Sequence, residues 1–124
     1  MQLEEMKIVE LINLINILKS IEIKTEIVNE DGRYVIVRTY SAGVFAGNIT
    51  IKNGKEVTLK NARRLWQWSG AASLSQLSQS GTSDPDSCKF PCEVERVILT
   101  EAIEILDVTI EAEKSIKSVK VWTQ

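Results

Sequence analysis

The chain of 124 residues contains no histidine. Histidine is the usual general base near neutral pH and the commonest ligand of transition metals. Its absence excludes a Ser-His-Asp or Cys-His nucleophile system and a Cys₂His₂ zinc site. We therefore expect a binding protein that is not an enzyme, with no catalytic residue, no resident metal and no cofactor.

Cysteine is scarce as well, and Cys88 and Cys92 are the two that occur. Their C-x₃-C spacing is one sulfur pair short of a tetrahedral zinc site. A zinc shared across a subunit interface and a disulfide in a tight turn are two alternatives, although a reducing cytosol disfavours the disulfide. The interpretation we favour is two ordinary thiols in a loop.

The chain also lacks a strong charge imbalance and a long apolar run. Its net charge is −2 and its basic residues are scattered, so no basic stripe predicts binding to a nucleic acid polymer. Charged and amide residues interrupt the apolar N-terminal segment, which has no basic start and no small-residue cleavage site. We expect a protein without a membrane segment or signal peptide, inside the cell.

The first nineteen residues predict a helix. Apolar residues dominate from Leu3 to Leu18, and polar residues recur every third position from Lys7 to Lys19, which draws one narrow polar stripe. A single small sheet would cover only part of so apolar a helix, and large exposed apolar patches are unusual in monomers. We interpret residues 1–19 as an oligomerisation helix; burial within its own domain is the alternative.

The body of the single domain, residues 20–124, is predicted to contain strands followed by short helices. Strand patterns joined by turn signals predict two hairpins, Ser20–Val28 with Arg33–Tyr40 and Asn48–Ile51 with Glu56–Lys60. Gly43 and Gly47 between them indicate a bulge or a close approach to the backbone. Further predicted elements follow in order: a helix over Ala71–Gln79 stopped by Gly81, an irregular loop over Thr82–Cys92, one or two strands over Val94–Val108, and a helix over Ile110–Val119 capped by Thr109.

These elements predict an α+β fold. It consists of an antiparallel sheet with a long N-terminal helix and short flanking helices, assembled as an oligomer.

The segment Asn61–Leu74 concentrates the residues suited to a ligand. It holds two adjacent arginines, two of the three tryptophans and a Ser-Gly-Ala-Ala-Ser run. Arginine forks bind phosphate through paired hydrogen bonds, indoles stack on bases or cations, and helix starts offer N–H groups to anions. On a strand, Arg64, Trp66 and Trp68 share one face. The segment predicts a site for a small phosphate-bearing ligand.

Two long runs carry a resemblance to a known family. They are Arg-Tyr-Val-Ile-Val-Arg-Thr-Tyr-Ser-Ala-Gly-Val-Phe-Ala-Gly at 33–47 and Asn-Ala-Arg-Arg-Leu-Trp-Gln-Trp-Ser-Gly-Ala-Ala-Ser-Leu-Ser-Gln-Leu at 61–77. Together with Cys88-Lys89-Phe90, Glu104-Ile105 and Val121-Trp122, they resemble the phage anti-Thoeris sponge family over most of residues 33–122.

The resemblance implies a function. In Thoeris defence, a bacterial TIR-domain enzyme converts NAD into a cyclic ADP-ribose isomer that activates a toxic effector. The sponge proteins bind this messenger, glycocyclic ADP-ribose, without cleaving it. They form dimers and larger even-numbered oligomers with pockets between protomers. The resemblance therefore implies a phage protein in the host bacterial cytoplasm whose partners are this ligand and its own copies; cyclic oligonucleotides from related defences are a second ligand class that it leaves open.

The candidate ligand-binding residues are expected to take different roles. Arg63 or Arg64 is expected to bind phosphate, and Trp66 or Trp68 to contact a ring. Backbone or hydroxyl donors are expected from Ser69, Gly70 and Ala71, and a pocket wall from Gly43 and Phe45. Second-rank candidates are Arg38, Lys89, Phe90 and Arg96.

Two other functions compete with the sponge. One is a metal-dependent nucleotide hydrolase that uses Asp84, Asp86 or Glu93, although these carboxylates show no ordered metal-ligand spacing. The other is a protein–protein inhibitor of a host factor that docks through the tryptophan face.

Overall fold

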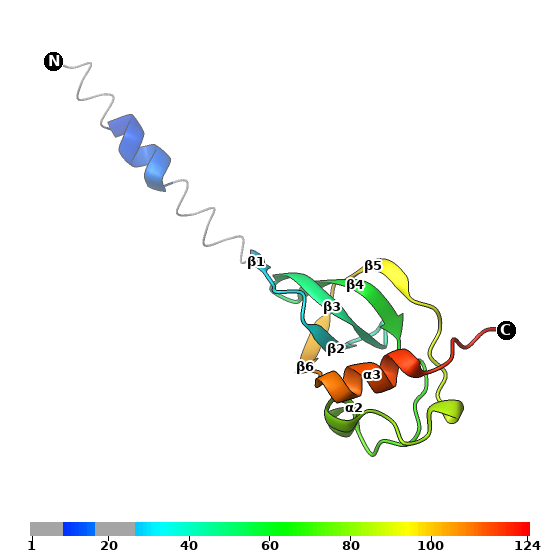
Figure 1. Cartoon of the computed structure of the whole chain (residues 1–124). Coiled ribbons are helices and arrows are strands. Elements are labelled where there is room, and N and C mark those ends of the chain that lie inside the picture. The colour runs from blue at the N-terminus through cyan, green and yellow to red at the C-terminus, as the bar shows by residue number, and fades with distance from the viewer. Residues whose placement is uncertain (1–8, 17–26) are drawn as a thin grey trace.

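The computed structural model describes residues 9–16 and 27–124, in which six strands form one antiparallel sheet with short helices packed on one side (Figure 1). The strand order is β5-β4-β3-β2-β6, and the short strand β1 also pairs with β3. The strands are β1 (Ile27–Asn29), β2 (Tyr34–Thr39), β3 (Val44–Asn53), β4 (Glu56–Arg64), β5 (Val94–Leu99) and β6 (Ala102–Asp107). The predicted antiparallel sheet is therefore present.

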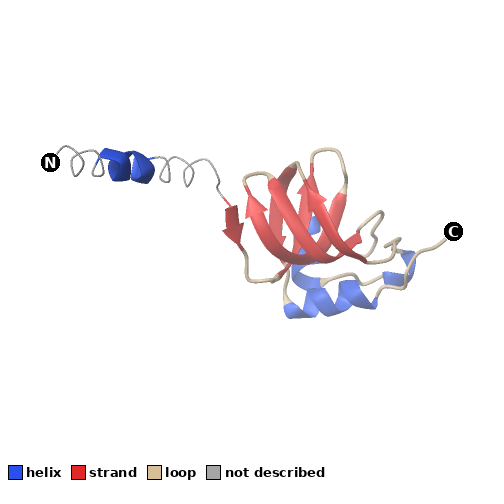
Figure 2. Cartoon of the chain, turned by 90° about the horizontal axis from the view of Figure 1, so that it is seen from above, coloured by secondary structure: helices blue, strands red, loops and turns tan. Residues whose placement is uncertain are grey.

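The sheet is strongly curved, with helices α2 (Leu74–Ser80) and α3 (Ile110–Ser118) gathered along one side of it (Figure 2). Strand β2 shows how both of its faces are covered, because all four residues from Tyr34 to Val37 are buried. Val35 and Val37 belong to one apolar core with residues of β3, β4 and β5, whereas Tyr34 and Ile36 belong to a second core with residues of α2 and α3. The first core thus joins strands to one another, and the second joins the sheet to the helices.

Both predicted short helices are present, although α2 begins at Leu74, three residues later than predicted. Helix α2 (Leu74–Ser80) is capped by the Ser73 hydroxyl and ends at Gly81, which has a positive φ of 75°. Helix α3 (Ile110–Ser118) is capped by Thr109. A 3₁₀ turn, η1 (Pro85–Ser87), lies in the predicted irregular loop. None of the helices in the described residues is long and apolar enough to cross a membrane.

The prediction of a long N-terminal helix is wrong. Within the predicted range, the structure describes a helix over residues 9–16 only; positions 1–8 and 17–19 lie outside the described residues. The other described α-helices are also short, with seven residues in α2 and nine in α3. Apolar periodicity identifies the face that a helix would bury, but it does not set the length of the helix, which depends on packing.

The predicted hairpin between Ser20–Val28 and Arg33–Tyr40 is also wrong. Residues 20–26 lie outside the described residues, and β1 pairs with β3, as β2 does. Strands β1 and β2 are consecutive pieces of one extended segment that runs antiparallel to β3. Main-chain bonds from Glu30 N to Thr50 O and from Gly32 N to Ile49 O carry the ladder across the interruption.

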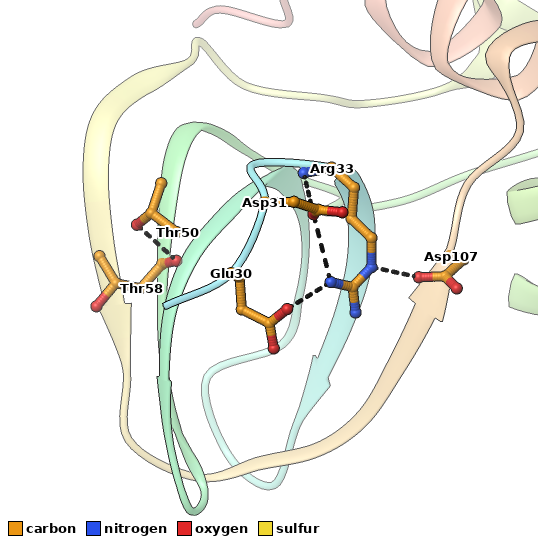
Figure 3. Close-up of polar contacts among 6 residues, drawn as sticks. All are labelled: Glu30, Asp31, Arg33, Thr50, Thr58 and Asp107. Atoms are coloured by element: carbon orange, nitrogen blue, oxygen red, sulfur yellow. Dashed lines mark hydrogen bonds and ion pairs between the residues drawn. The ribbon is translucent and has the colours of Figure 1, made fainter. Parts of the chain in front are cut away.

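Arg33 connects the segment between β1 and β2 to strand β6, which lies on the other side of β2 from β3 (Figure 3). Its guanidinium contacts the carboxylates of Glu30 at 2.6 Å and Asp107 of β6 at 2.8 Å, and its main-chain N–H donates to Asp31. These carboxylate hydrogen bonds, the one to Asp107 first, raise the pKa of the guanidinium. The Asn-Glu-Asp-Gly run therefore forms a charged bulge within one extended segment instead of a chain reversal.

Candidate functional site

A cavity of about 470 Å³ opens where β4 ends, beside the turn that leads into β3. Strand β4 ends at Arg64, and the residues that follow run along the cavity. Arg64, Trp66 and Trp68 all line it. The remaining lining residues are Ser41, Ala42, Gly43, Val44 and Leu65.

Arg64 is held in place by the residues around it. Its guanidinium carbon lies 4.3 Å from the centre of the Phe45 ring, and Nη1 donates to the carbonyl of Ala42. A guanidinium carries five N–H donors, so one such contact leaves the fork able to bind an anion. Phe45, which is predicted to form a pocket wall, is buried and packs against the guanidinium of Arg64 instead.

Gly43 shapes the wall opposite Arg64. Its φ of +91° favours glycine, and a Cβ there would lie 3.5 Å from Arg64 Nη1. The Gly43 carbonyl accepts hydrogen bonds from the main-chain N–H of Thr39 and from the Thr39 hydroxyl, at 3.0 and 2.7 Å. At Gly43, the turn thus exposes main-chain atoms to the cavity without a covering side chain.

Arg63 lies on the other face of β4, away from the cavity. It is 3% exposed, and its guanidinium donates to four main-chain carbonyls at 2.6 to 3.0 Å. These carbonyls belong to Phe90, Pro91, Ile116 and Val119. Burial lowers the pKa of this arginine. Because these hydrogen bonds occupy its donors, Arg63 stabilises the core. Of the two arginines expected to bind phosphate, Arg64 is therefore the one with a guanidinium available to a ligand.

The Ser-Gly-Ala run serves the fold of a loop, because α2 begins only at Leu74. The Ser69 N–H donates to the Cys88 sulfur, and the Ser69 carbonyl accepts from the Thr82 hydroxyl. Gly70 packs against residues 82–84 with a φ of +76°. Ser69, Gly70 and Ala71 are not among the residues that line the cavity.

The second-rank candidates also lie apart from the cavity lining. Arg38 pairs with Glu104 of the neighbouring strand at 3.2 Å, and Arg96 is exposed on β5. Phe90 is fully buried beneath the guanidinium of Arg63. Lys89 is exposed and lies over the ring of Trp122.

Trp122 is the neighbouring residue that the site prediction missed. Its ring stacks nearly parallel to that of Trp66, with centroids 6.5 Å apart and planes inclined by 7°. The only signal in the sequence is the Val121-Trp122 pair within the family resemblance. The two tryptophans meet because the Trp122 N–H bonds to the Phe90 carbonyl at 2.9 Å and Lys89 bridges to Gln67, contacts that local patterns do not encode.

The carboxylates and thiols considered as alternatives do not gather into a centre. Both cysteines are free, with Cys88 buried and Cys92 exposed. Asp84 contacts the Ser69 hydroxyl at 3.4 Å, outside the cavity lining. In residues 9–16 and 27–124, no group of three histidine, cysteine, aspartate or glutamate side chains is placed to hold a metal ion.

The fold and site define a small domain in which a curved antiparallel sheet presents an arginine and two tryptophans around an open cavity. Residues 32–116 match the family model described as Domain of unknown function (DUF6948). Because the match covers more than half of the chain, the protein belongs to this family. No curated protein and no solved structure matches the chain.

Proposed function

We propose that the protein binds and sequesters a cyclic ADP-ribose isomer made by a bacterial TIR-domain enzyme. The observation that carries this proposal is the convergence of the Arg64 fork, the Trp66 and Trp68 indoles and the bare main chain of Gly43 on one cavity. Acting as a phage anti-defence protein, it would remove the Thoeris messenger before the effector responds. The resemblance of its sequence to the anti-Thoeris sponge family motivates the choice of ligand. Cyclic oligonucleotides are a second class of probe.

The size and chemistry of the cavity support a ligand of this kind. A volume of about 470 Å³ falls in the range of small-molecule sites, which extends from roughly 300 to 1,000 Å³. The messenger carries two linked phosphates and an adenine. Arg64 can offer paired N–H donors to a phosphate, and the indoles can stack on the base.

Sequestration also fits the residues that line the cavity. They are one arginine together with apolar, glycine and serine residues, so the lining offers no carboxylate, thiol or lysine as a general base. A sponge needs only tight binding with slow release. For nanomolar affinity, the required binding free energy is about −12 kcal/mol.

Self-association is part of the proposal. The cavity is open to solvent in the single chain, whereas tight binding of a small ligand calls for near-complete enclosure. A second copy of the chain can supply the missing wall. The described N-terminal segment supports association because its apolar side chains, Val9, Leu11, Ile12, Leu14 and Ile15, are all about half exposed. The place of action we propose is the host bacterial cytoplasm, where the messenger is made.

Calorimetric titration with glycocyclic ADP-ribose, followed by mass analysis of the ligand released on heating, tests the proposal. We expect nanomolar binding and unchanged ligand. Arg64→Ala should weaken binding about 100-fold, because it removes the charged donor pair. Arg96→Ala, which removes an exposed arginine outside the cavity lining, should bind like the wild type.

Three results would count against the proposal. The absence of any heat of binding would remove the messenger as ligand, and a degraded ligand would make the protein an enzyme. Equal affinity in Arg64→Ala and Arg96→Ala would place the site away from this cavity.

A further inference from the structure

We infer that Trp66, Trp122 and Lys89 form a subsite that holds the planar base of the ligand, next to the phosphate position at Arg64. This inference deepens the proposed function and rests on it for the identity of the whole ligand. The recognising chemistry is that of a nucleobase attached to a phosphate, with adenine as the base of the proposed messenger.

The two indoles form a nearly parallel aromatic pair. Their centroids are 6.5 Å apart and their planes are inclined by 7°, which is the range of offset-stacked aromatic pairs. A planar base that stacks on the exposed ring of Trp66 would therefore lie nearly parallel to the ring of Trp122 as well.

The exposure of Trp66 points to a ligand. Its side chain is 62% exposed, although tryptophan is largely buried in most proteins. The same residue lines the cavity that contains Arg64, so a base stacked on it would be continuous with a phosphate at the guanidinium. Burial of an exposed indole face by a base is the way single-stranded nucleotides are held on aromatic platforms.

Trp122 is positioned by the chain and by a cation. Its main-chain N–H bonds to the Phe90 carbonyl, which places the C-terminal segment beside the end of β4. The buried guanidinium of Arg63 donates to the carbonyls of both Val119 and Phe90. It therefore holds together the segment that carries Trp122 and the segment that carries Lys89. Lys89 Nζ lies 5.6 Å from the centre of the Trp122 ring and adds a positive charge for a ligand phosphate.

Fluorescence of a single tryptophan tests the subsite directly. The chain has three tryptophans, so Trp66→Phe combined with Trp68→Phe leaves Trp122 as the only emitter and keeps an aromatic ring at each position. Adenosine and ADP-ribose should quench its emission by stacking. Ribose 5-phosphate, which carries the phosphate without the base, should leave the emission unchanged.

Affinity measurements provide the second arm. Trp122→Ala should weaken binding of glycocyclic ADP-ribose about tenfold or more, and Trp122→Phe should restore most of it. Tyr40→Ala is the matched control, because it removes an aromatic residue that is 78% exposed and does not line the cavity. Its affinity should equal that of the wild type.

The outcomes separate the two proposals. If the wild type binds the messenger but Trp122→Ala binds equally well and the Trp122 emission is unmoved, the subsite is overturned and the proposed function stands. If adenosine quenches Trp122 while glycocyclic ADP-ribose does not bind, the proposed function is lost and the subsite stands. If no adenine-bearing probe quenches the Trp122 emission, the subsite is overturned. This fluorescence result does not depend on whether Trp122→Ala folds.

Discussion

Two adjacent arginines take opposite positions because neighbouring residues on a strand point to opposite faces. Arg63 enters the core beneath the helices and donates to four carbonyls, whereas Arg64 reaches the cavity and rests on Phe45. The alternation itself could be predicted from the sequence. Which of the two arginines is buried could not, because that depends on the carbonyls of the 90–91 loop and of the end of α3.

Tyr34 carries the one buried side-chain polar atom that lacks a hydrogen-bond partner among the described residues. Burial is the main cause that raises the pKa of its phenol, with the negative charges of Glu93 and Glu113 adding to the shift. The phenol therefore stays neutral in the folded protein at a pH where an unfolded tyrosine ionises. Above pH 10, the ordinary value, the unfolded state has lost a proton that the folded state retains, so stability falls as pH rises.

Tyr34→Phe should stabilise the protein by about 1 kcal/mol, because it removes an unsatisfied buried hydroxyl while keeping the ring. It should also reduce the loss of stability above about pH 10. Urea denaturation at neutral and alkaline pH measures both effects. Tyr40→Phe, at an exposed tyrosine, is the control and should change neither. A less stable Tyr34→Phe variant would show that the hydroxyl has a partner, such as a bound water.

At the scale of elements, the sequence predicts strands and helix ends well where the signal is local. The Asn53-Gly54 turn, the Ser73 and Thr109 caps and the Gly81 stop all act within a few residues. Pairing between distant segments is not local. The Asn29–Gly32 run fits both a reversal and a bulge, and the choice is made by its pairing to β3 and by Asp107. The contact between Trp66 and Trp122 is likewise non-local and was not predicted.

Gly70 belongs to the loop that connects β4 to α2, where its conformation and its close neighbours both require glycine. A Cβ at this position would lie 2.4 Å from Asp84 N and 2.8 Å from Ser83 N. Gly70→Ala should therefore destabilise the protein by more than the 1 to 2 kcal/mol or so that a positive φ alone costs.

Gly32→Ala is the matched control for this prediction, because Gly32 has a φ of +82° and a Cβ added there would meet no atom within 4 Å. Thermal unfolding of the two variants compares conformational strain alone with strain plus steric contact. Equal losses of stability would mean that the 82–84 loop moves aside freely. A loss of ligand binding in Gly70→Ala without a loss of stability would return the Ser69–Ala71 run to the binding site.

At the scale of the whole molecule, the proposed second copy would cover both the open cavity and the exposed apolar segment 9–16. The sequence predicts association from the apolar character of the segment, but it overestimates the helix, since the described helix covers only residues 9–16. The curved sheet, by contrast, buries its own cores on both faces within one chain. Folding of the body and assembly of the oligomer are therefore expected to be separable.

Leu11→Glu combined with Ile15→Glu tests that separation, because positions four apart lie on one face of a helix. We expect light scattering to show an oligomer for the wild type and a 13.9 kDa monomer for the double variant, with an unchanged unfolding transition. Asn13→Glu combined with Asn16→Glu adds the same charge at positions that are already polar and should remain oligomeric. A monomeric wild type at micromolar concentration would refute self-association. If the charged double variant is a folded monomer and also loses the messenger, the partner copy completes the pocket; if it binds as the wild type does, the Arg64 cavity suffices within one chain.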